Sequence, residues 1–117
     1  MSDLNKMLLT GVVVQDVELR FTPTGAKTAN IRVAIHRKYK TKAQEVKEET
    51  EFVTVIVWEI TAENCAKYLK KGSRVFVEGR LQTREYEKDG QKRLAVEIKA
   101  DTVEFLDKPE KEEKKEE

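Results

Sequence analysis

Short segments in which apolar and polar residues alternate run along most of this 117-residue sequence, and they constrain its fold more than any other feature. A two-residue period is typical of a β-strand that buries one face. Strands are therefore predicted over residues 7–14, 29–35, 52–58, 75–84 and 94–98, and a short apolar piece follows at 102–106. The residues predicted to point inward in the last three strands are Val53, Val55, Val57, Val75, Val77, Leu81, Leu94, Val96 and Ile98.

The period changes once, between the third and the fourth of these strands. Helical spacing relates four small or apolar residues there: Ala62, Cys65, Ala66 and Leu69. Thr61 is the predicted N-cap of this helix, and Lys70-Lys71-Gly72 would give it a basic end with a glycine stop. A single short helix is therefore expected between strands three and four.

The connections between the strands are predicted from their turn residues. Thr22-Pro23-Thr24-Gly25 and Lys88-Asp89-Gly90 have the composition of tight turns. Residues 37–51 are almost entirely polar and are predicted to form a long hairpin loop. Gly11 predicts a bulge or bend in the first strand, of the kind found where one strand serves both sheets of a small barrel.

Five strands with one helix between the third and the fourth are the order of an OB-fold barrel, so an all-β fold is predicted. An SH3-like barrel would lack the helix, and a sandwich would need more strands. The domain is expected to span residues 1–106. Residues 107–117 contain six acids, four lysines and no hydrophobic residue, so they are predicted to form a disordered charged tail.

The charge balance conceals a difference between these two parts. The whole chain has 23 basic and 22 acidic residues, a formal net charge of +1. Removing the tail, which carries a net charge of −2, leaves a body with 19 bases and 16 acids, or +3. The near-zero total therefore does not exclude a nucleic-acid partner.

Several classes of protein are disfavoured by composition. No apolar run approaches the ~20 residues that cross a bilayer, and the N-terminus lacks the features of a secretion signal, so no membrane contact is expected. One cysteine and one histidine can form neither an internal disulfide nor a four-ligand zinc site, which favours a reducing cytoplasm. His36 and Cys65 fall on different elements, and no glycine-rich phosphate loop is present. No enzyme activity, catalytic residue, metal or cofactor is therefore expected.

Four aromatic residues stand where packing does not explain them. Tyr39 lies within the basic run Arg37-Lys38-Tyr39-Lys40, Phe52 and Trp58 lie opposite the valine face of the third strand, and Tyr86 shares the outward positions of Arg80 and Arg84. Exposed rings interleaved with bases are typical of surfaces that bind single-stranded nucleic acid, where bases stack and phosphates are neutralised. Burial of Phe52 and Trp58, in a two-sided strand or a subunit interface, remains the alternative. The other aromatics, expected to pack, are Phe21, Tyr68, Phe76 and Phe105.

Several stretches carry a resemblance to a known family. They are Asn5-Lys6-Met7-Leu8-Leu9-Thr10-Gly11, Gln15-Asp16-Val17-Glu18-Leu19-Arg20-Phe21-Thr22-Pro23-Thr24-Gly25, Ala29-Asn30-Ile31, Tyr68-Leu69-Lys70-Lys71-Gly72-Ser73, Val77-Glu78-Gly79-Arg80-Leu81-Gln82-Thr83-Arg84 and Val103-Glu104-Phe105-Leu106. Together they resemble the bacterial single-stranded DNA-binding proteins over essentially residues 4–106. The resemblance implies an OB-fold that binds and protects single-stranded DNA in replication, recombination and repair. It also implies a homotetramer, assembled through the first strands of its subunits, in the cytoplasm with the nucleoid.

The resemblance assigns roles to individual residues. Its base-stacking positions fall on Tyr39, Phe52, Trp58 and Tyr86, and its phosphate-binding positions fall on Arg20, Lys71 and Arg84. Two positions where relatives can carry a base hold Thr54 and Ile60 here. Arg32 and Arg80, which share the outward positions of neighbouring strands, are the expected substitutes. Arg37, in the basic run around Tyr39, is also expected to bind phosphate.

Some properties stay open at this point. Relatives end in an acidic tail with a hydrophobic tip that docks replication and repair proteins, whereas this chain ends in Lys115-Glu116-Glu117. A primosome-type OB-fold adaptor that binds single strands and replication partners is the alternative function. Site size, cooperativity, dimer against tetramer, and DNA against RNA do not follow from the sequence.

Overall fold

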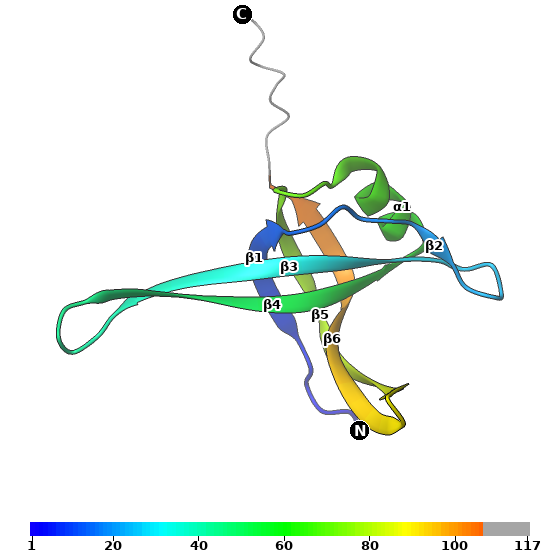
Figure 1. Cartoon of the computed structure of the whole chain (residues 1–117). Coiled ribbons are helices and arrows are strands. Elements are labelled where there is room, and N and C mark those ends of the chain that lie inside the picture. The colour runs from blue at the N-terminus through cyan, green and yellow to red at the C-terminus, as the bar shows by residue number, and fades with distance from the viewer. Residues whose placement is uncertain (107–117) are drawn as a thin grey trace, which may run out of the picture.

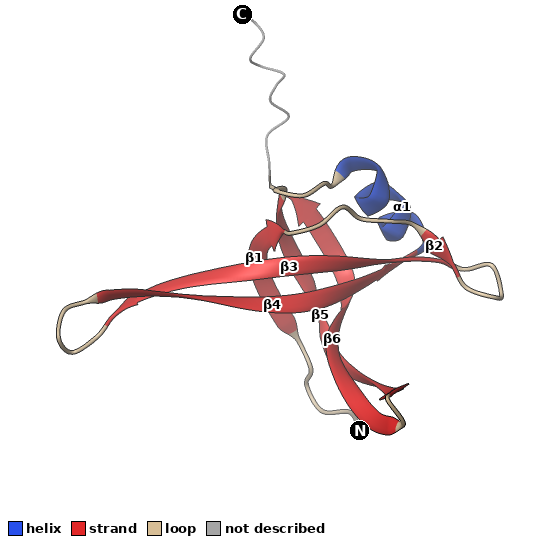
Figure 2. Cartoon of the chain, viewed as in Figure 1, coloured by secondary structure: helices blue, strands red, loops and turns tan. Residues whose placement is uncertain are grey.

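The fold is a small β-barrel with one helix at its end (Figures 1 and 2). A computed structural model describes residues 1–106, and the tail predicted for residues 107–117 lies outside the described residues. The elements in chain order are β1 Met7–Val13, β2 Arg20–Phe21, β3 Lys27–Lys40, β4 Val46–Trp58, α1 Glu59–Tyr68, β5 Arg74–Lys88 and β6 Gln91–Phe105. The predicted OB-fold order is confirmed, with the two-residue β2 as an addition that the alternation did not indicate.

Strand β1 closes the barrel by pairing on both of its edges. The sheet order is β1-β5-β6-β4-β3-β2, and β1 also pairs with β3. Gly11 and Val12 pair with β5, while Val12 and Val13 pair with β3. A Cβ on Gly11 would lie 2.6 Å from the carbonyl oxygen of Ala34, so the two strands approach too closely for any side chain there. The prediction that the first strand serves both sides of a barrel is confirmed.

The core fills the barrel with side chains from every long strand and from one side of the helix. Its fully buried members are mostly β-branched, as expected for residues on a pleated surface. They include Val13, Ile31, Val33, Val55, Val57, Val75, Val77, Ile98 and Cys65. Ala62 and Cys65 bring α1 against this cluster, which explains the helical spacing seen in the sequence. Among the described residues, no helix has the length and apolar character needed to cross a membrane.

The prediction of a long polar loop over residues 37–51 is wrong, because most of these residues belong to strands β3 and β4. Pairing between β3 and β4 continues to Lys40 and Val46, and only a short turn remains. Cross-strand ion pairs join Arg37 to Glu49 and Lys38 to Glu48, so charged rather than apolar side chains line this ribbon. A ribbon beyond the barrel buries no face, and its sequence therefore lacks the alternation that identifies a strand.

The second hairpin also extends beyond the barrel. Strand β6 pairs with β4 only at residues 97–99, while β5 and β6 pair as far as Lys88 and Gln91. Leu81, Leu94 and Val96, predicted to point inward, are 43%, 64% and 58% exposed. Their alternation is real, but the barrel ends before it reaches them.

The predicted helix boundaries are wrong in detail. Trp58 rather than Thr61 is the N-cap of α1, and no side-chain hydrogen bond caps it. The helix ends at Tyr68, and Gly72 lies in the following turn with φ of 98°. The turns predicted at Thr22-Pro23-Thr24-Gly25 and Lys88-Asp89-Gly90 are confirmed, with positive φ at Gly25, Asp89 and Gly90.

The glycine at the β5–β6 irregularity gives a testable prediction. A Cβ on Gly79 would overlap the carbonyl oxygen of Lys99 and lie 2.8 Å from the Cα of Ala100. Because backbone atoms rather than flexible side chains fill this space, Gly79→Ala should lower the free energy of unfolding by about 2 kcal/mol. Urea unfolding at fixed protein concentration measures it. Thr83→Ala, at an exposed position of the same strand, is the control and should change stability by no more than about 0.5 kcal/mol; equal effects of the two variants would contradict the close approach at Gly79.

Candidate nucleic-acid interface

Register brings residues of several strands onto one continuous outer face of the sheet. Residues that pair across neighbouring strands project to the same side. One row crosses four strands through Arg32, Thr54, Glu97 and Gln82. By the same pairing, the outer face comprises Arg20 of β2, Thr28, Asn30, Arg32 and Ala34 of β3, Phe52, Thr54, Ile56 and Trp58 of β4, Arg93, Ala95, Glu97 and Lys99 of β6, and Arg80, Gln82, Arg84 and Tyr86 of β5.

Three of the four aromatic residues singled out in the sequence lie on this outer face. Phe52, Trp58 and Tyr86 are 53%, 36% and 38% exposed. Their large apolar rings are therefore open to solvent in this chain. Trp58 is the last residue of β4 and also the N-cap of α1, so the start of the helix fixes its position at one end of the face.

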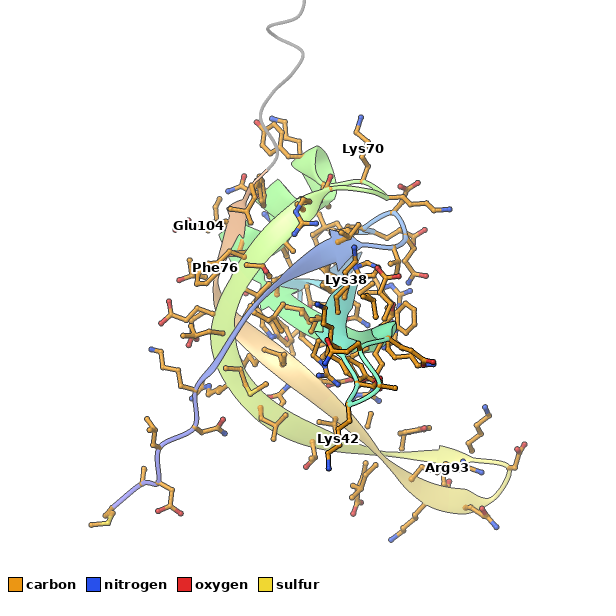
Figure 3. The ribbon with its side chains drawn as sticks, turned by 90° about the vertical axis from the view of Figure 1, so that its left-hand side faces the viewer. Lys38, Lys42, Lys70, Phe76, Arg93 and Glu104 are labelled. Carbon is orange, nitrogen blue, oxygen red and sulfur yellow. The ribbon has the colours of Figure 1, made fainter. Side chains whose placement is uncertain are left out.

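Tyr39, the fourth aromatic, lies apart from the other three. It pairs with Lys47 on the protruding β3–β4 ribbon, and its position in the alternation is opposite to that of Phe52. Two-stranded ribbons twist strongly, and Figure 1 shows β3 and β4 winding around each other toward the tip. Figure 3, viewed toward this tip, places Lys38 and Lys42 on the ribbon and Arg93 on the separate β5–β6 hairpin.

An arginine lies over each of three aromatic rings. The guanidinium carbon is 5.7 Å from the ring centre for Arg32 over Phe52 and for Arg84 over Tyr86, and 4.7 Å for Arg37 over Tyr39. Such contacts hold a ring and a cation in one place. Because a ring has two faces, a guanidinium on one face leaves the other for a planar partner.

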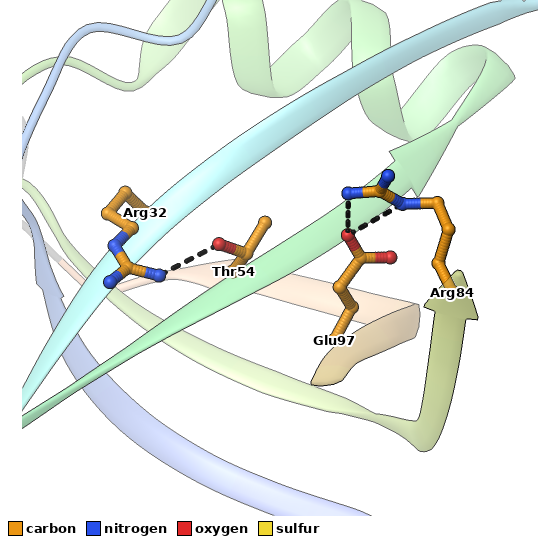
Figure 4. Close-up of polar contacts among 4 residues, drawn as sticks. All are labelled: Arg32, Thr54, Arg84 and Glu97. Carbon is orange, nitrogen blue, oxygen red and sulfur yellow. Dashed lines mark hydrogen bonds and ion pairs between the residues drawn. The ribbon is translucent and has the colours of Figure 1, made fainter. Parts of the chain in front are cut away.

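Polar contacts fix two of these arginines further (Figure 4). Arg32 donates from Nη1 to Oγ1 of Thr54 at 2.9 Å. Arg84 donates from Nε and from Nη2 to Oε2 of Glu97, at 3.1 and 2.8 Å. Hydrogen bonding to Glu97, with the attraction of its charge, raises the pKa of Arg84 above its ordinary value.

The ribbon arginine has a similar but more exposed partner. Arg37 donates from Nη2 to Oε1 of Glu49 at 2.5 Å, and the hydroxyl of Tyr39 donates to Oε2 of the same carboxylate at 3.2 Å. Solvent surrounds this group, because the Arg37 and Glu49 side chains are 61% and 44% exposed. Exposed ion pairs of this kind stabilise little, so the two side chains can exchange partners readily.

The remaining predicted bases differ in how they relate to the outer face. Arg20 pairs with Thr28, which pairs with Trp58, so Arg20 continues the row that contains the tryptophan. Arg80 pairs with Lys99 near the middle of the face. Lys71 lies in the turn after α1, where its backbone N–H donates to Oδ1 of Asp16 at 3.2 Å, and no strand pairing joins it to the face within residues 1–106.

Sequence reasoning missed two basic residues of this face. Lys99 pairs with Arg80 and Ile56, and Arg93 pairs with Tyr86. Lys99 follows Ile98 and Arg93 precedes Leu94, and both of these apolar residues point to the opposite face. The alternation that identified the strand would therefore have placed both lysine and arginine outward.

The packing expected of the other aromatics is only partly observed. Phe21 and Tyr68 are 63% and 57% exposed, so that expectation is wrong for these two. Phe105 is 38% exposed, and its ring centre lies 6.3 Å from that of Tyr68. Phe76 is partly buried. A two-residue period assigns a face but does not say how much of it neighbouring elements cover.

Comparison with known proteins gives one consistent result. The model of the "Single-strand binding protein family" matches residues 4–106. The chain is 41% identical over 105 residues to a single-stranded DNA-binding protein of Oceanobacillus iheyensis, covering 89% of this chain and 64% of that protein. It is 42% identical over 105 residues to single-stranded DNA-binding protein A of Bacillus subtilis, covering 89% and 60%. The chain thus spans somewhat less than two thirds of the length of these relatives.

A solved structure agrees in fold. A Plasmodium falciparum SSB complex with ssDNA superposes with a TM-score of 0.82 at 28% identity. The match covers 92% of this chain and 98% of that chain. The similarity therefore extends over the barrel and is not confined to single motifs.

The histidine and the cysteine of the chain lie apart from each other among the described residues. No group of three or more His, Cys, Asp and Glu side chains that could hold a metal ion occurs within residues 1–106. His36 is exposed on β3, while Cys65 is fully buried in α1. Burial raises the pKa of the Cys65 thiol from an ordinary 9.0 to about 11.

Cys65 should consequently resist thiol reagents until the chain unfolds. Only the thiolate is nucleophilic, and with a pKa of about 11 roughly one thiol in a thousand is ionised at pH 8. We expect the Ellman's reagent reaction at pH 8 to be at least about 100-fold slower in the native protein than in urea. Since the unfolded thiol ionises first, stability should also fall as the pH rises from about 9 to about 11. Native and unfolded rates within tenfold of each other would contradict the burial of this side chain.

Proposed function

The chain belongs to the single-strand binding protein family, and from this we propose that it binds and protects single-stranded DNA without sequence preference, in replication, recombination and repair. The observation that carries the proposal is the outer face, on which exposed rings alternate with guanidinium groups. Every base has an aromatic face, so stacking on Phe52, Trp58 and Tyr86 would be independent of sequence. The relatives that match this chain are named as single-stranded DNA-binding proteins.

The phosphates between the stacked nucleobases would contact the basic side chains of the outer face. Arg20 extends the row of Trp58, and Arg32 lies over Phe52. Arg80 and Lys99 share the row of Ile56, between the rows of Trp58 and Phe52. Neutralising phosphates releases bound counterions, which gives binding its salt dependence. Among the residues assigned to the outer face, several are arginine or lysine and Glu97 is the one acid. The local charge of the outer face is therefore positive, although the whole chain is nearly neutral.

Three predicted contact residues lie beyond the outer face and would extend the path of the strand. Tyr39 and Arg37 lie together on the β3–β4 ribbon, where Glu49 holds both of them in the absence of DNA. Lys71 lies in the turn that follows α1. We assign Tyr39 to stacking and Arg37 and Lys71 to phosphates, as continuations of the same single strand.

Self-association is part of this proposal. Strand β1 pairs with β5 through Met7, but it pairs with β3 only at Val12 and Val13, so within residues 1–106 the start of β1 has one open edge. An open edge is a template for pairing with another strand. We propose that a second copy pairs there and that dimers associate into a homotetramer. Linked copies would bind one long strand at several sites.

The remaining assignments follow from this activity. We infer that the chain acts by binding alone, without catalysis, and that it works in the cytoplasm on the DNA of the nucleoid. Replication and repair proteins are the partners proposed for it. An outer face made of aromatic rings and basic side chains suits such a binding role.

The single tryptophan provides a direct test of stacking. Trp58 is the one tryptophan of the chain and lies on the outer face, so oligo-dT should strongly quench its fluorescence. Duplex DNA of equal length, whose bases are already stacked, should quench it weakly. Unchanged emission at saturating oligo-dT, with binding shown by a labelled oligonucleotide, would contradict stacking on Trp58.

Substitution of another ring should weaken binding by a predictable amount. Loss of one base–aromatic stack costs about 1 to 3 kcal/mol, so Phe52→Ala should raise the Kd for a dT oligonucleotide by roughly five- to 150-fold. The matched control is Tyr68→Ala, which removes an aromatic of similar exposure from α1. Fluorescence anisotropy of labelled oligo-dT measures both. Equal Kd values for the two variants would argue against the outer face as the binding surface.

A further inference from the structure

Glu97 is a buried carboxylate in the middle of a face proposed to bind an anionic polymer. It is 3% exposed, and it lies in the row between Thr54 of β4 and Gln82 of β5. Burying a carboxylate is unfavourable unless a cation and hydrogen bonds compensate. An acid at this position repels phosphate as well. Glu97 takes no part in the barrel core, which β6 reaches through the neighbouring Ile98 on its other face.

Arg84 provides the compensation and is in turn immobilised. Its Nε and Nη2 both donate to Oε2 of Glu97, at 3.1 and 2.8 Å. If Arg84 turned away toward a phosphate, Glu97 would remain buried without this partner. The pair should therefore persist when DNA binds, unlike the exposed pair of Arg37 and Glu49.

The immobilised guanidinium still has donors to offer. A guanidinium carries five N–H groups, and the bonds to Glu97 engage Nε and one N–H of Nη2. The side chain of Arg84 is 57% exposed, so the remaining donors reach solvent. Its guanidinium carbon lies 5.7 Å from the centre of the Tyr86 ring. Ring and donors are thus held in a fixed relation before any ligand arrives.

We propose that Glu97 is a positioning residue that holds Arg84 over Tyr86 and cancels the charge of that arginine. The inference rests on the proposed binding of single strands and says how the subsite formed by Arg84 and Tyr86 takes part in that binding. Tyr86 and Arg84 together form a rigid place for one base and its phosphate, made by stacking and directed hydrogen bonds. Because the Arg84–Glu97 pair is neutral, this subsite contributes affinity with little dependence on salt.

Two variants, one single and one double, separate the positioning role of Glu97 from its effect on charge. Glu97→Gln keeps the shape and an oxygen acceptor for Arg84 but unmasks one positive charge. Arg84→Met combined with Glu97→Gln removes the pair while leaving the net charge unchanged and no buried acid unpaired. Glu104→Gln is the matched control, because it makes the same charge change at an exposed position near the C-terminal end of β6. Thermal unfolding establishes that each variant is folded before binding is measured.

The measurement is the Kd for fluorescein-labelled oligo-dT as a function of NaCl concentration. For Glu97→Gln we expect the slope of log K against log salt to steepen by about 0.7, one more phosphate neutralised on a single strand. Because Arg84 is held less firmly in this variant, the affinity of Glu97→Gln extrapolated to 1 M salt should fall about threefold to tenfold. Its plot of log K against log salt should therefore cross that of the unmodified chain. The double variant should give a parallel line at lower affinity, and Glu104→Gln should give an unchanged line.

The outcomes separate this inference from the proposed function. A slope for Glu97→Gln equal to that of Glu104→Gln would overturn charge cancellation by Glu97. A double variant with a slope shallower than the unmodified chain by about 0.7 would overturn it too, because Arg84 would then count as a full cation. If Glu97→Gln and the double variant both keep the affinity of the unmodified chain at 1 M salt, the positioning role of Glu97 is overturned. Failure of the unmodified chain to bind oligo-dT at any salt would instead overturn the proposed function, and this role of Glu97 with it.

Discussion

The double pairing of β1 is the constraint on which the rest of the structure depends. Hydrogen bonds to β5 on one edge and to β3 on the other close the sheet, and Gly11 permits the approach that this requires. The closed sheet holds the β3–β4 and β5–β6 hairpins side by side, and the turn of each hairpin sets its own register. The parallel pairing of β4 with β6 then joins the two hairpins and places Arg32, Thr54 and Glu97 in one row on the outer face.

Two hairpins continue past the closed barrel and give the molecule its reach. In the β3–β4 ribbon, ion pairs between Arg37 and Glu49 and between Lys38 and Glu48 replace apolar cross-strand contacts. In the β5–β6 hairpin, Leu94 and Val96 stay exposed on the side opposite Tyr86. Each ribbon thus carries an aromatic and an arginine away from the core. A surface of this kind can follow an extended ligand, where a compact barrel alone would offer one flat patch.

Carboxylates hold two arginines of the candidate interface, although the outer face as a whole is positive. The chain has nearly equal numbers of acids and bases, and in the candidate interface Glu97 and Glu49 hold Arg84 and Arg37 while both arginines contact rings. Burial separates the two pairs, because a buried pair resists exchange and an exposed pair does not. In the candidate interface, pairing with Glu97 and Glu49 thus fixes the geometry of Arg84 and Arg37 at the cost of part of their net charge.

The sequence by itself determined the strand content, the single helix, the turn glycines and the outward positions of Phe52 and Trp58, because local periodicity and turn chemistry depend on near neighbours along the chain. It misjudged residues 37–51, since a ribbon that buries no face has no alternation to detect. It also placed Leu81 and Leu94 in a core that ends before it reaches them. Only the tertiary structure decided that Glu97 of β6 is buried in the middle of the outer face, because the parallel pairing of β6 with β4 joins strands that are distant in the sequence, whereas the hairpin turn alone sets the register that brings Glu97 to Arg84 of β5.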